Sequence, residues 1–136
     1  MPRNINIQKV KLPKKGSIEE DINYLCKSLG YFSNRDKNET AGKIFRIIVQ
    51  RGVAEDEGVK SEEIANEVGL TRGAIIHHLN SFIDSGIIVK ERNSYRLRAQ
   101  SLRKSLEEVK TDMERIFREM IKIAEEVDEK LGYFYR

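Results

Sequence analysis

Hydrophobic positions follow a helical spacing over most of the chain, with one short exception. Apolar residues recur every three or four positions over residues 18–29, 38–50, 61–68, 71–85 and 102–131, which is the period of an amphipathic helix. Residues 87–98 instead hold two short runs rich in β-branched and aromatic residues around an Asn93-Ser94 turn, which predicts a β-hairpin. The pattern therefore predicts a mainly α fold with one small hairpin (α+β).

Residues 61 to 86 predict two short helices joined by a tight turn. Ser61 is the expected N-cap of the first helix. The corner is expected to hold Gly69 in a left-handed conformation, Leu70 as a hydrophobic plug and Thr71 as the cap of the second helix, which Gly86 ends. The expected buried faces of the two helices consist of Ile64, Ala65, Val68, Ile75, Leu79 and Phe82. Two such helices followed directly by a hairpin predict a winged helix-turn-helix.

The stretch Ala74-Ile75-Ile76-His77-His78-Leu79, together with Ser85-Gly86-Ile87-Ile88 and Tyr95-Arg96-Leu97, resembles the ArsR-type branch of winged-helix transcription regulators of bacteria and archaea, here an archaeal one. The resemblance is close over residues 39–98 and extends to the order of elements in the whole chain. It implies a homodimer that binds an inverted repeat in double-stranded DNA and represses transcription until a signal releases it. Metal-sensing members carry clustered Cys or Asp and His ligands, whereas this chain has one Cys and two His, so no metal or other cofactor is expected.

The C-terminal segment carries a long heptad seam. Its members are spaced alternately four and three residues apart: Leu102, Leu106, Val109, Met113, Ile116, Met120, Ile123 and Val127. This predicts a helix of about 30 residues, roughly 45 Å long, that dimerises as a coiled coil. Phe117, Ala124 and Leu131 widen the seam, so the second half should touch more than one neighbour. The expected neighbours are the same helix of a second subunit and the 18–29 helix; the alternative is that the helix folds back over its own domain.

Positive charge is concentrated in two places. The net charge is +3, and residues 1–16 contain five Lys or Arg and no acidic residue. Residues 71–98 carry five basic residues against two acidic ones. The organisation expected from these patterns is a basic N-terminal arm or strand (1–16), a winged helix-turn-helix domain (17–98) and a dimerisation helix (99–136). A two-fold dimer would place its recognition helices about 34 Å apart, one turn of DNA.

The residues expected to contact DNA lie on the second helix and on the wing. Steps of about 100° place Gly73, His77 and Asn80 opposite the buried face of this helix. Ile76 flanks them and either contacts a thymine methyl group or completes the core. Recognition helix 71–85 is expected in the major groove, and wing 87–98 on the backbone or minor groove. The full set of candidates is Thr71, Arg72, Gly73, Ile76, His77, Asn80, Lys90, Arg92 and Arg96.

Other function classes find less support in the sequence. It has no phosphate-binding glycine loop and no nucleophile placed with a base, so no enzyme is expected. Neither a membrane span nor a signal peptide is expected, and the single Cys26, expected as a buried hydrophobe, fits a reducing cytoplasm. One alternative is an adaptor that binds other proteins in transcription or chromosome machinery. A small-molecule effector held between the long helix and the N-terminal helix is a further, unsupported option.

Overall fold

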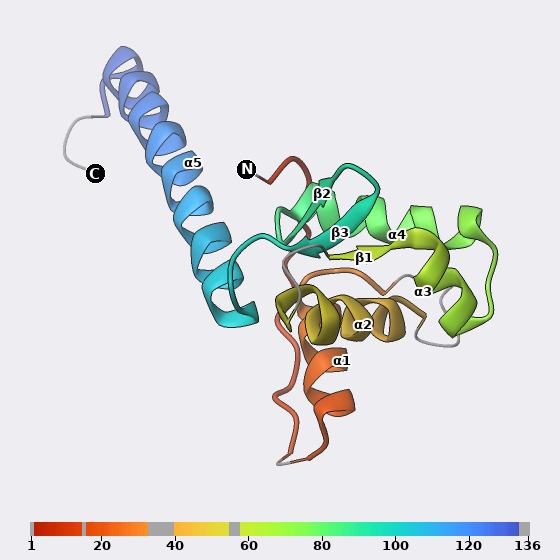
Figure 1. The fold of residues 1–136 in the computed structure, drawn as a ribbon. Coiled ribbons are helices and arrows are strands. Elements are labelled where there is room, and N and C mark those ends of the chain that lie inside the picture. The colour runs from red at the N-terminus through yellow and green to blue at the C-terminus, as the bar shows by residue number, and fades with distance from the viewer. Residues whose placement is uncertain (1, 15, 33–39, 55–57, 134–136) are drawn as a thin grey trace.

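A computed structural model of the chain describes residues 2–14, 16–32, 40–54 and 58–133 (Figure 1). The elements in chain order are α1 (Ile18–Ser28), α2 (Thr40–Ala54), β1 (Val59–Lys60), α3 (Ser61–Val68), α4 (Arg72–Ser85), β2 (Ile88–Glu91), β3 (Ser94–Leu97) and α5 (Leu102–Leu131). The mainly helical chain with a small antiparallel sheet and a long C-terminal helix confirms the predicted winged helix-turn-helix fold. The expected start of the second helix near Asn38 lies outside the described residues.

Helix α2 forms the centre of the core. Its apolar face, formed by Ala41, Ile44, Phe45 and Ile48, is completely buried. The ring of Phe45 packs edge-on against Phe82 of α4, with 5.3 Å between the ring centroids. Because α1, α3, α4 and β3 all contact α2, its burial fixes the position of α4 on the body (Figure 1).

The corner between α3 and α4 forms as predicted at three positions. Gly69 is left-handed (φ 72°), and its N–H donates to Ala65 O at 2.9 Å. The Thr71 hydroxyl accepts from the Ala74 N–H at 3.3 Å, and Gly86 (φ 89°) ends α4. The buried faces of α3 and α4 are also as predicted, except that Val68 is only half-buried.

Two expectations for α3 and the corner that follows it are wrong. The N-cap of α3 is Lys60, without a side-chain cap, and Ser61 is the first helical residue. The side chain of Ser61 points into the body and is 5% exposed, so it does not cap the helix. Leu70 is 41% exposed and therefore does not fill the corner, because α2 already covers the inner side of α3.

The wing belongs to a three-stranded antiparallel sheet with the order β1-β3-β2. In the hairpin, Ile88 pairs with Leu97 and Glu91 with Ser94. The turn is therefore Arg92–Asn93, one residue earlier than predicted, with Arg92 left-handed (φ 59°). Strand β1, which pairs Val59 with Tyr95, was not predicted, because two residues are too short to show alternation.

Helix α1 begins at a capping box, where the Ser17 hydroxyl accepts from the Glu20 N–H at 3.3 Å. Cys26 is buried against the core as expected, together with Ile22 and Leu29. Ile18 is 58% exposed, because it lies in the first turn at the edge of the contact between α1 and α2.

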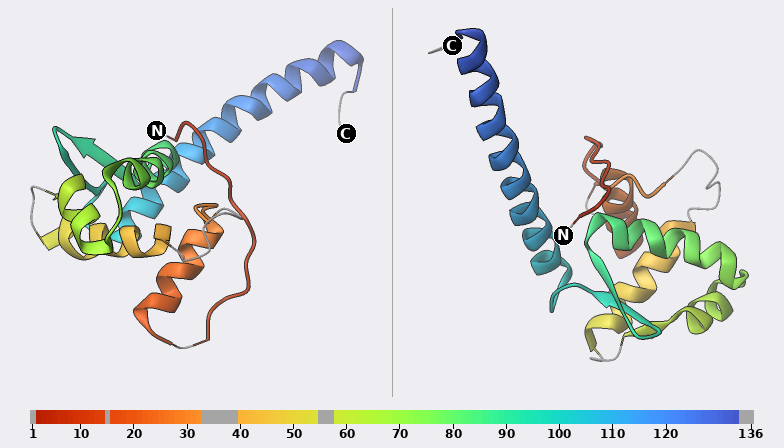
Figure 2. Two further views of the ribbon diagram at one scale, coloured as in Figure 1. Left: turned by 90° about the vertical axis from the view of Figure 1, so that its right-hand side faces the viewer. Right: turned by 90° about the horizontal axis from the view of Figure 1, so that it is seen from above.

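The N-terminal arm is extended and runs from the end of α4 to α1 (Figures 1 and 2). The N–H groups of Arg3 and Asn4 donate to Asp84 O at 2.7 and 3.1 Å, and the Gln8 N–H donates to Ser28 O at 2.8 Å. Gly30 (φ 72°) lets the arm pass closely, since a Cβ at this position would lie 2.5 Å from Asn6 O. Within residues 2–14 the structure shows an ordered arm and no strand.

The long C-terminal helix has the predicted length, but its two halves differ. In the first half, Val109 is 3% exposed, and Leu102, Leu106 and Met113 pack against the core. The second half projects from the body (Figure 2). There Ile123 is 57% exposed. The alternative in which the helix folds back over its own domain thus holds for the first half only. Within one chain, α1 packs on α2 and stands apart from the projecting half of α5.

Candidate nucleic-acid interface

Helix α4 lies at the outside of the molecule (Figure 2, right), and its exposed side chains are mostly polar. Its inner face is completely buried at Ile75, Leu79 and Phe82. On the opposite face, the predicted candidates Arg72, Gly73, His77 and Asn80 are all exposed. Guanidinium and amide groups at this position can each make two hydrogen bonds to a base edge in the major groove. The structure therefore brings four of the predicted recognition-helix residues together on one surface.

The first turn of α4 is suited to a phosphate. Thr71 is exposed, and the N–H groups at this end carry the positive end of the helix dipole. A Cβ added at Gly73 would meet no atom within 4 Å. A backbone or a base can therefore approach this turn without displacing any side chain.

Ile76 is less available than the other candidates. It is half-buried and packs against the core, so most of its side chain completes the interior. Ala74 in the first turn is exposed instead, and alanine also contacts the thymine methyl group. The sequence reasoning missed Ala74, although its place one step after Gly73 on the helix could have indicated it. His78 is half-buried, and its ring lies 5.6 Å from the ring of His77.

The C-terminal end of α4 is held by groups that the sequence reasoning did not identify. The Tyr31 hydroxyl is hydrogen-bonded to the Ser85 hydroxyl in the core. Burial raises the pKa of the Tyr31 phenol well above its ordinary value, so the group stays neutral. The arm adds its two hydrogen bonds to Asp84 O. Helix α4 is therefore fixed at its last turn by both the core and the arm.

The wing cations divide into exposed and engaged groups. Arg92 is exposed at the tip, and Lys90 is exposed with its Nζ 5.7 Å from the Tyr95 ring centroid. Arg96 is engaged: its Nε donates to Glu91 Oε2 at 3.2 Å and its Nη1 to Leu97 O at 3.1 Å. Lys90 and Arg92 are thus the wing cations that remain most available to phosphate.

Arg98 is one of the five basic residues counted within residues 71–98, but its side chain faces α5. Its Nη1 lies 2.5 Å from Asp112 Oδ2 and its Nε 3.0 Å from Glu108 Oε1. The hydrogen bond from Arg98 holds the pKa of Asp112 below its ordinary value, and the same bond raises the pKa of Arg98. The pair joins the end of the wing to the base of α5, and its positive charge is neutralised there.

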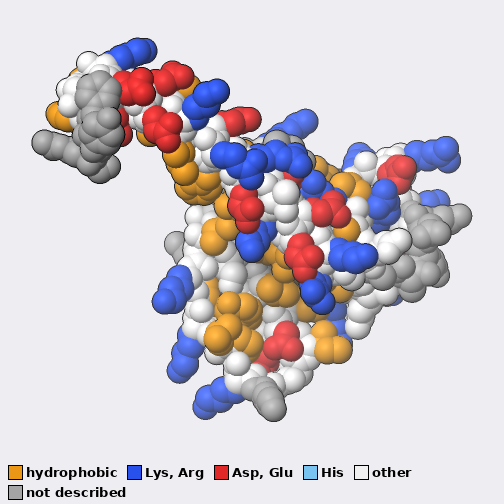
Figure 3. Space-filling view, turned by 90° about the vertical axis from the view of Figure 1, so that its left-hand side faces the viewer, with side chains coloured by type: hydrophobic (Ala, Val, Ile, Leu, Met, Phe, Trp, Pro, Cys, Tyr) orange, Lys and Arg blue, Asp and Glu red, His pale blue; other side chains and the backbone are white. Residues whose placement is uncertain are grey.

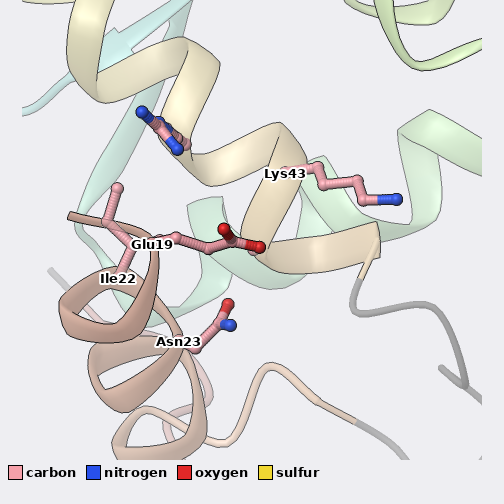
Figure 4. A pocket seen from close by; sticks show the side chains of 6 residues that line it. Glu19, Ile22, Asn23 and Lys43 are labelled. Carbon is pink, nitrogen blue, oxygen red and sulfur yellow. The ribbon is translucent and has the colours of Figure 1, made fainter. Parts of the chain in front are cut away.

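A small cavity of about 130 Å³ opens between α1 and α2 (Figure 4). Glu19, Ile22, Asn23 and Lys43 line it, together with Gly42 and Arg46. This cavity does not lie between the N-terminal helix and the long C-terminal helix, where the unsupported option of an effector site placed it. Among the described residues, no cluster of three potential metal ligands occurs and no helix is long and apolar enough to cross a membrane.

Residues 37–89 match a sequence family described as winged helix-turn-helix DNA-binding. The matched segment contains α2, α3 and α4 and ends within β2. No curated protein and no solved structure gives a significant match to the chain. The chain thus contains a winged helix-turn-helix segment that is similar to DNA-binding domains of this family, and α4 is the second helix of the motif.

Proposed function

We propose that the protein is a sequence-specific transcription regulator of the ArsR-like kind that binds double-stranded DNA as a homodimer. Helix α4 enters the major groove, and the β2–β3 wing lies over the backbone or the minor groove. The observation that carries this proposal is the exposed polar face of α4, beside a wing with exposed cations. The match of residues 37–89 to DNA-binding domains supports the same conclusion.

The exposed groups divide between reading bases and binding phosphate. Asn80 pairs with adenine, and Arg72 binds guanine or a phosphate group. His77 donates to a base or a phosphate, and the methyl group of Ala74 or the edge of Ile76 contacts thymine. Thr71 and the first-turn N–H groups bind phosphate. Lys90 and Arg92 follow the backbone from the wing, with Arg96 in a lesser role because Glu91 already engages it.

The projecting half of α5 supports the homodimer. Met120, Ile123 and Val127 of the seam are about half exposed, at 50, 57 and 48%. A helix this long with an apolar stripe is unstable in water without a partner, and a second copy supplies a matching stripe. A dimer that occupies an inverted repeat in a promoter blocks access of the transcription machinery, which makes the protein a repressor.

Fluorescence anisotropy measures binding to two DNA duplexes, one covering the protein's own promoter and one with a scrambled sequence, and so tests the proposal. We expect tight binding to the promoter duplex and weaker binding to the scrambled one. Arg72, Lys90 and Arg92 from two subunits make about six phosphate contacts, so affinity should fall about 10³-fold between roughly 50 and 200 mM salt. No binding to either duplex at low salt, even at tens of micromolar protein, would contradict DNA recognition and favour an adaptor that binds proteins.

A further inference from the structure

The apolar face of α5 runs along one side of the helix, but its two halves meet different neighbours. In the first half this side is covered by the body, and Val109 is 3% exposed. At about 100° per residue, Met120 and Val127 continue the same side beyond the body. Figure 3 shows hydrophobic side chains on the projecting part of α5 and again on the adjoining body. A helix that covers the second half must therefore end or turn away where the body begins.

We propose that a second copy covers this surface and that the two α5 helices run antiparallel. The inference rests on the proposed homodimer and specifies its geometry. In a parallel pair, the partner helix would continue along the first half of α5, into the space that the body fills. In an antiparallel pair, the first half of the partner helix and its body lie at the projecting end of α5, away from the body of the first copy (Figure 1).

The two edges of the apolar stripe favour the same orientation. One edge is apolar and exposed, with Phe117 at 55% and Leu131 at 60% and Ala124 between them. The other edge is charged and carries Glu119 and Glu126. In a parallel pair the two-fold axis runs along the helices, and each edge of one helix faces the opposite edge of the other. Glutamates would then face Phe117 and Leu131. In an antiparallel pair the two-fold axis lies across the helices and sets each edge against its own copy, so the apolar edge meets the apolar edge and the glutamate edge meets the glutamate edge.

A register for the antiparallel pair follows from the seam. Ile116 faces the partner's Val127, and Met120 faces the partner's Ile123. Along the apolar edge, Phe117 then lies opposite the partner's Ala124, a large residue against a small one.

On the charged edge, where Glu119 faces the partner's Glu126, neighbouring basic residues offset the repulsion in this register. Glu119 lies close to the partner's Lys122, and Arg115 lies close to the partner's Glu126. Within its own chain, Arg115 is only loosely paired, with Nη1 3.7 Å from Asp112 Oδ1, and its side chain is 59% exposed. Opposite charges thus meet on both sides of the two-fold axis.

This geometry places the DNA-binding domains at opposite ends of the helix pair. In the proposed register the two Val109 residues are about 38 Å apart along the axis at 1.5 Å per residue. That separation already exceeds one turn of DNA, about 34 Å. The two half-sites should therefore be more than one turn apart, farther than the one-turn spacing expected from the sequence.

Distances between nitroxide spin labels in the full-length dimer test the orientation. Lys104→Cys labels the base of α5 and Arg118→Cys its middle, both at exposed positions on the outer face of the helix. The antiparallel pair predicts about 50 Å between the labels at 104 and less than about 30 Å at 118. Wild-type protein exposed to the label is the control, since Cys26 is completely buried and should remain unlabelled.

The other outcomes are distinct. Short distances at both positions would indicate a parallel pair and overturn this proposal, while a dimeric DNA-binding protein would remain. Long distances at both positions would indicate a dimer through another surface and also overturn it. A single-chain mass by light scattering, with no distance at either position, would overturn the homodimer itself.

Discussion

Arg98 and Asp112 form the ion pair that joins the wing to α5, and the Asp112 side chain is 6% exposed. The substitution Asp112→Asn keeps the shape of the side chain but removes the negative charge from an ion pair that is largely shielded from solvent. We expect a loss of about 1–2 kcal/mol of unfolding free energy at pH 7, less than for a deeply buried pair because Arg98 keeps contact with water. Urea unfolding curves measure this loss.

The same pair predicts a pH dependence. Because the pKa of Asp112 is lowered in the folded state, its contribution is present above the unfolded pKa, about 3.9, and is lost as the pH falls through the folded pKa. The difference between wild type and Asp112→Asn should therefore be smaller at about pH 3 than at pH 7. Glu107→Gln, which removes an exposed partner of Arg103, is the control and should change stability little. Equal differences at both pH values would contradict this role for the Asp112 charge.

Single residues show where sequence reasoning reached its limit. Helical spacing correctly predicts which side chains of α4 point inward and which point outward, because the 100° step depends on the helix alone. It does not predict that Arg96 and Arg98 bind carboxylates, since Arg98 and Asp112 are brought together only by tertiary packing. Ser61 is a similar case: a serine before an apolar run resembles an N-cap, and burial decides otherwise.

At the scale of elements, the N-cap of α4 gives a direct test of how the recognition helix begins. Thr71→Ala removes the hydroxyl that accepts from the Ala74 N–H. We expect a loss of about 1 kcal/mol of unfolding free energy, because this N–H loses its partner. Thr71→Ser keeps the hydroxyl and should retain most of the stability in the same urea measurement. If Thr71→Ala unfolds at the wild-type urea concentration, the cap does not stabilise α4.

Long elements were predictable and short ones were not. The period of α5 extends over 30 residues, so its existence and length follow from the sequence. Strand β1 contains two residues and depends on its pairing with β3, which no local pattern shows. In its first half, the predicted seam of α5 packs against the body, and its pairing with a second copy stays a prediction. An apolar stripe does not specify its neighbour, however, and the division between the body and the projecting half needed the structure.

At the scale of the whole molecule, the projecting half of α5 predicts how assembly and DNA binding are linked. Ile123 is 57% exposed in one chain, so Ile123→Glu should leave the fold intact and place a charge in the helix pair. Light scattering should then give a single-chain mass, and promoter affinity should fall more than about tenfold, since the two domains no longer bind together.

The control for this experiment is Arg118→Gln, which changes the charge by the same amount on the outer face of α5. It should remain a dimer with wild-type affinity. A dimeric Ile123→Glu protein would show that the subunits associate through a different surface.

The central claim is that the exposed face of α4 reads DNA sequence, and Asn80→Ala tests it most directly. Anisotropy at fixed salt with promoter and scrambled duplexes should show a loss of about 1–3 kcal/mol, roughly 5- to 150-fold, on the promoter and little change on the scrambled duplex. Asn66→Ala, on the exposed surface of α3, is the matched control and should bind as wild type. Unchanged promoter affinity and preference in Asn80→Ala would contradict base recognition by this face of α4.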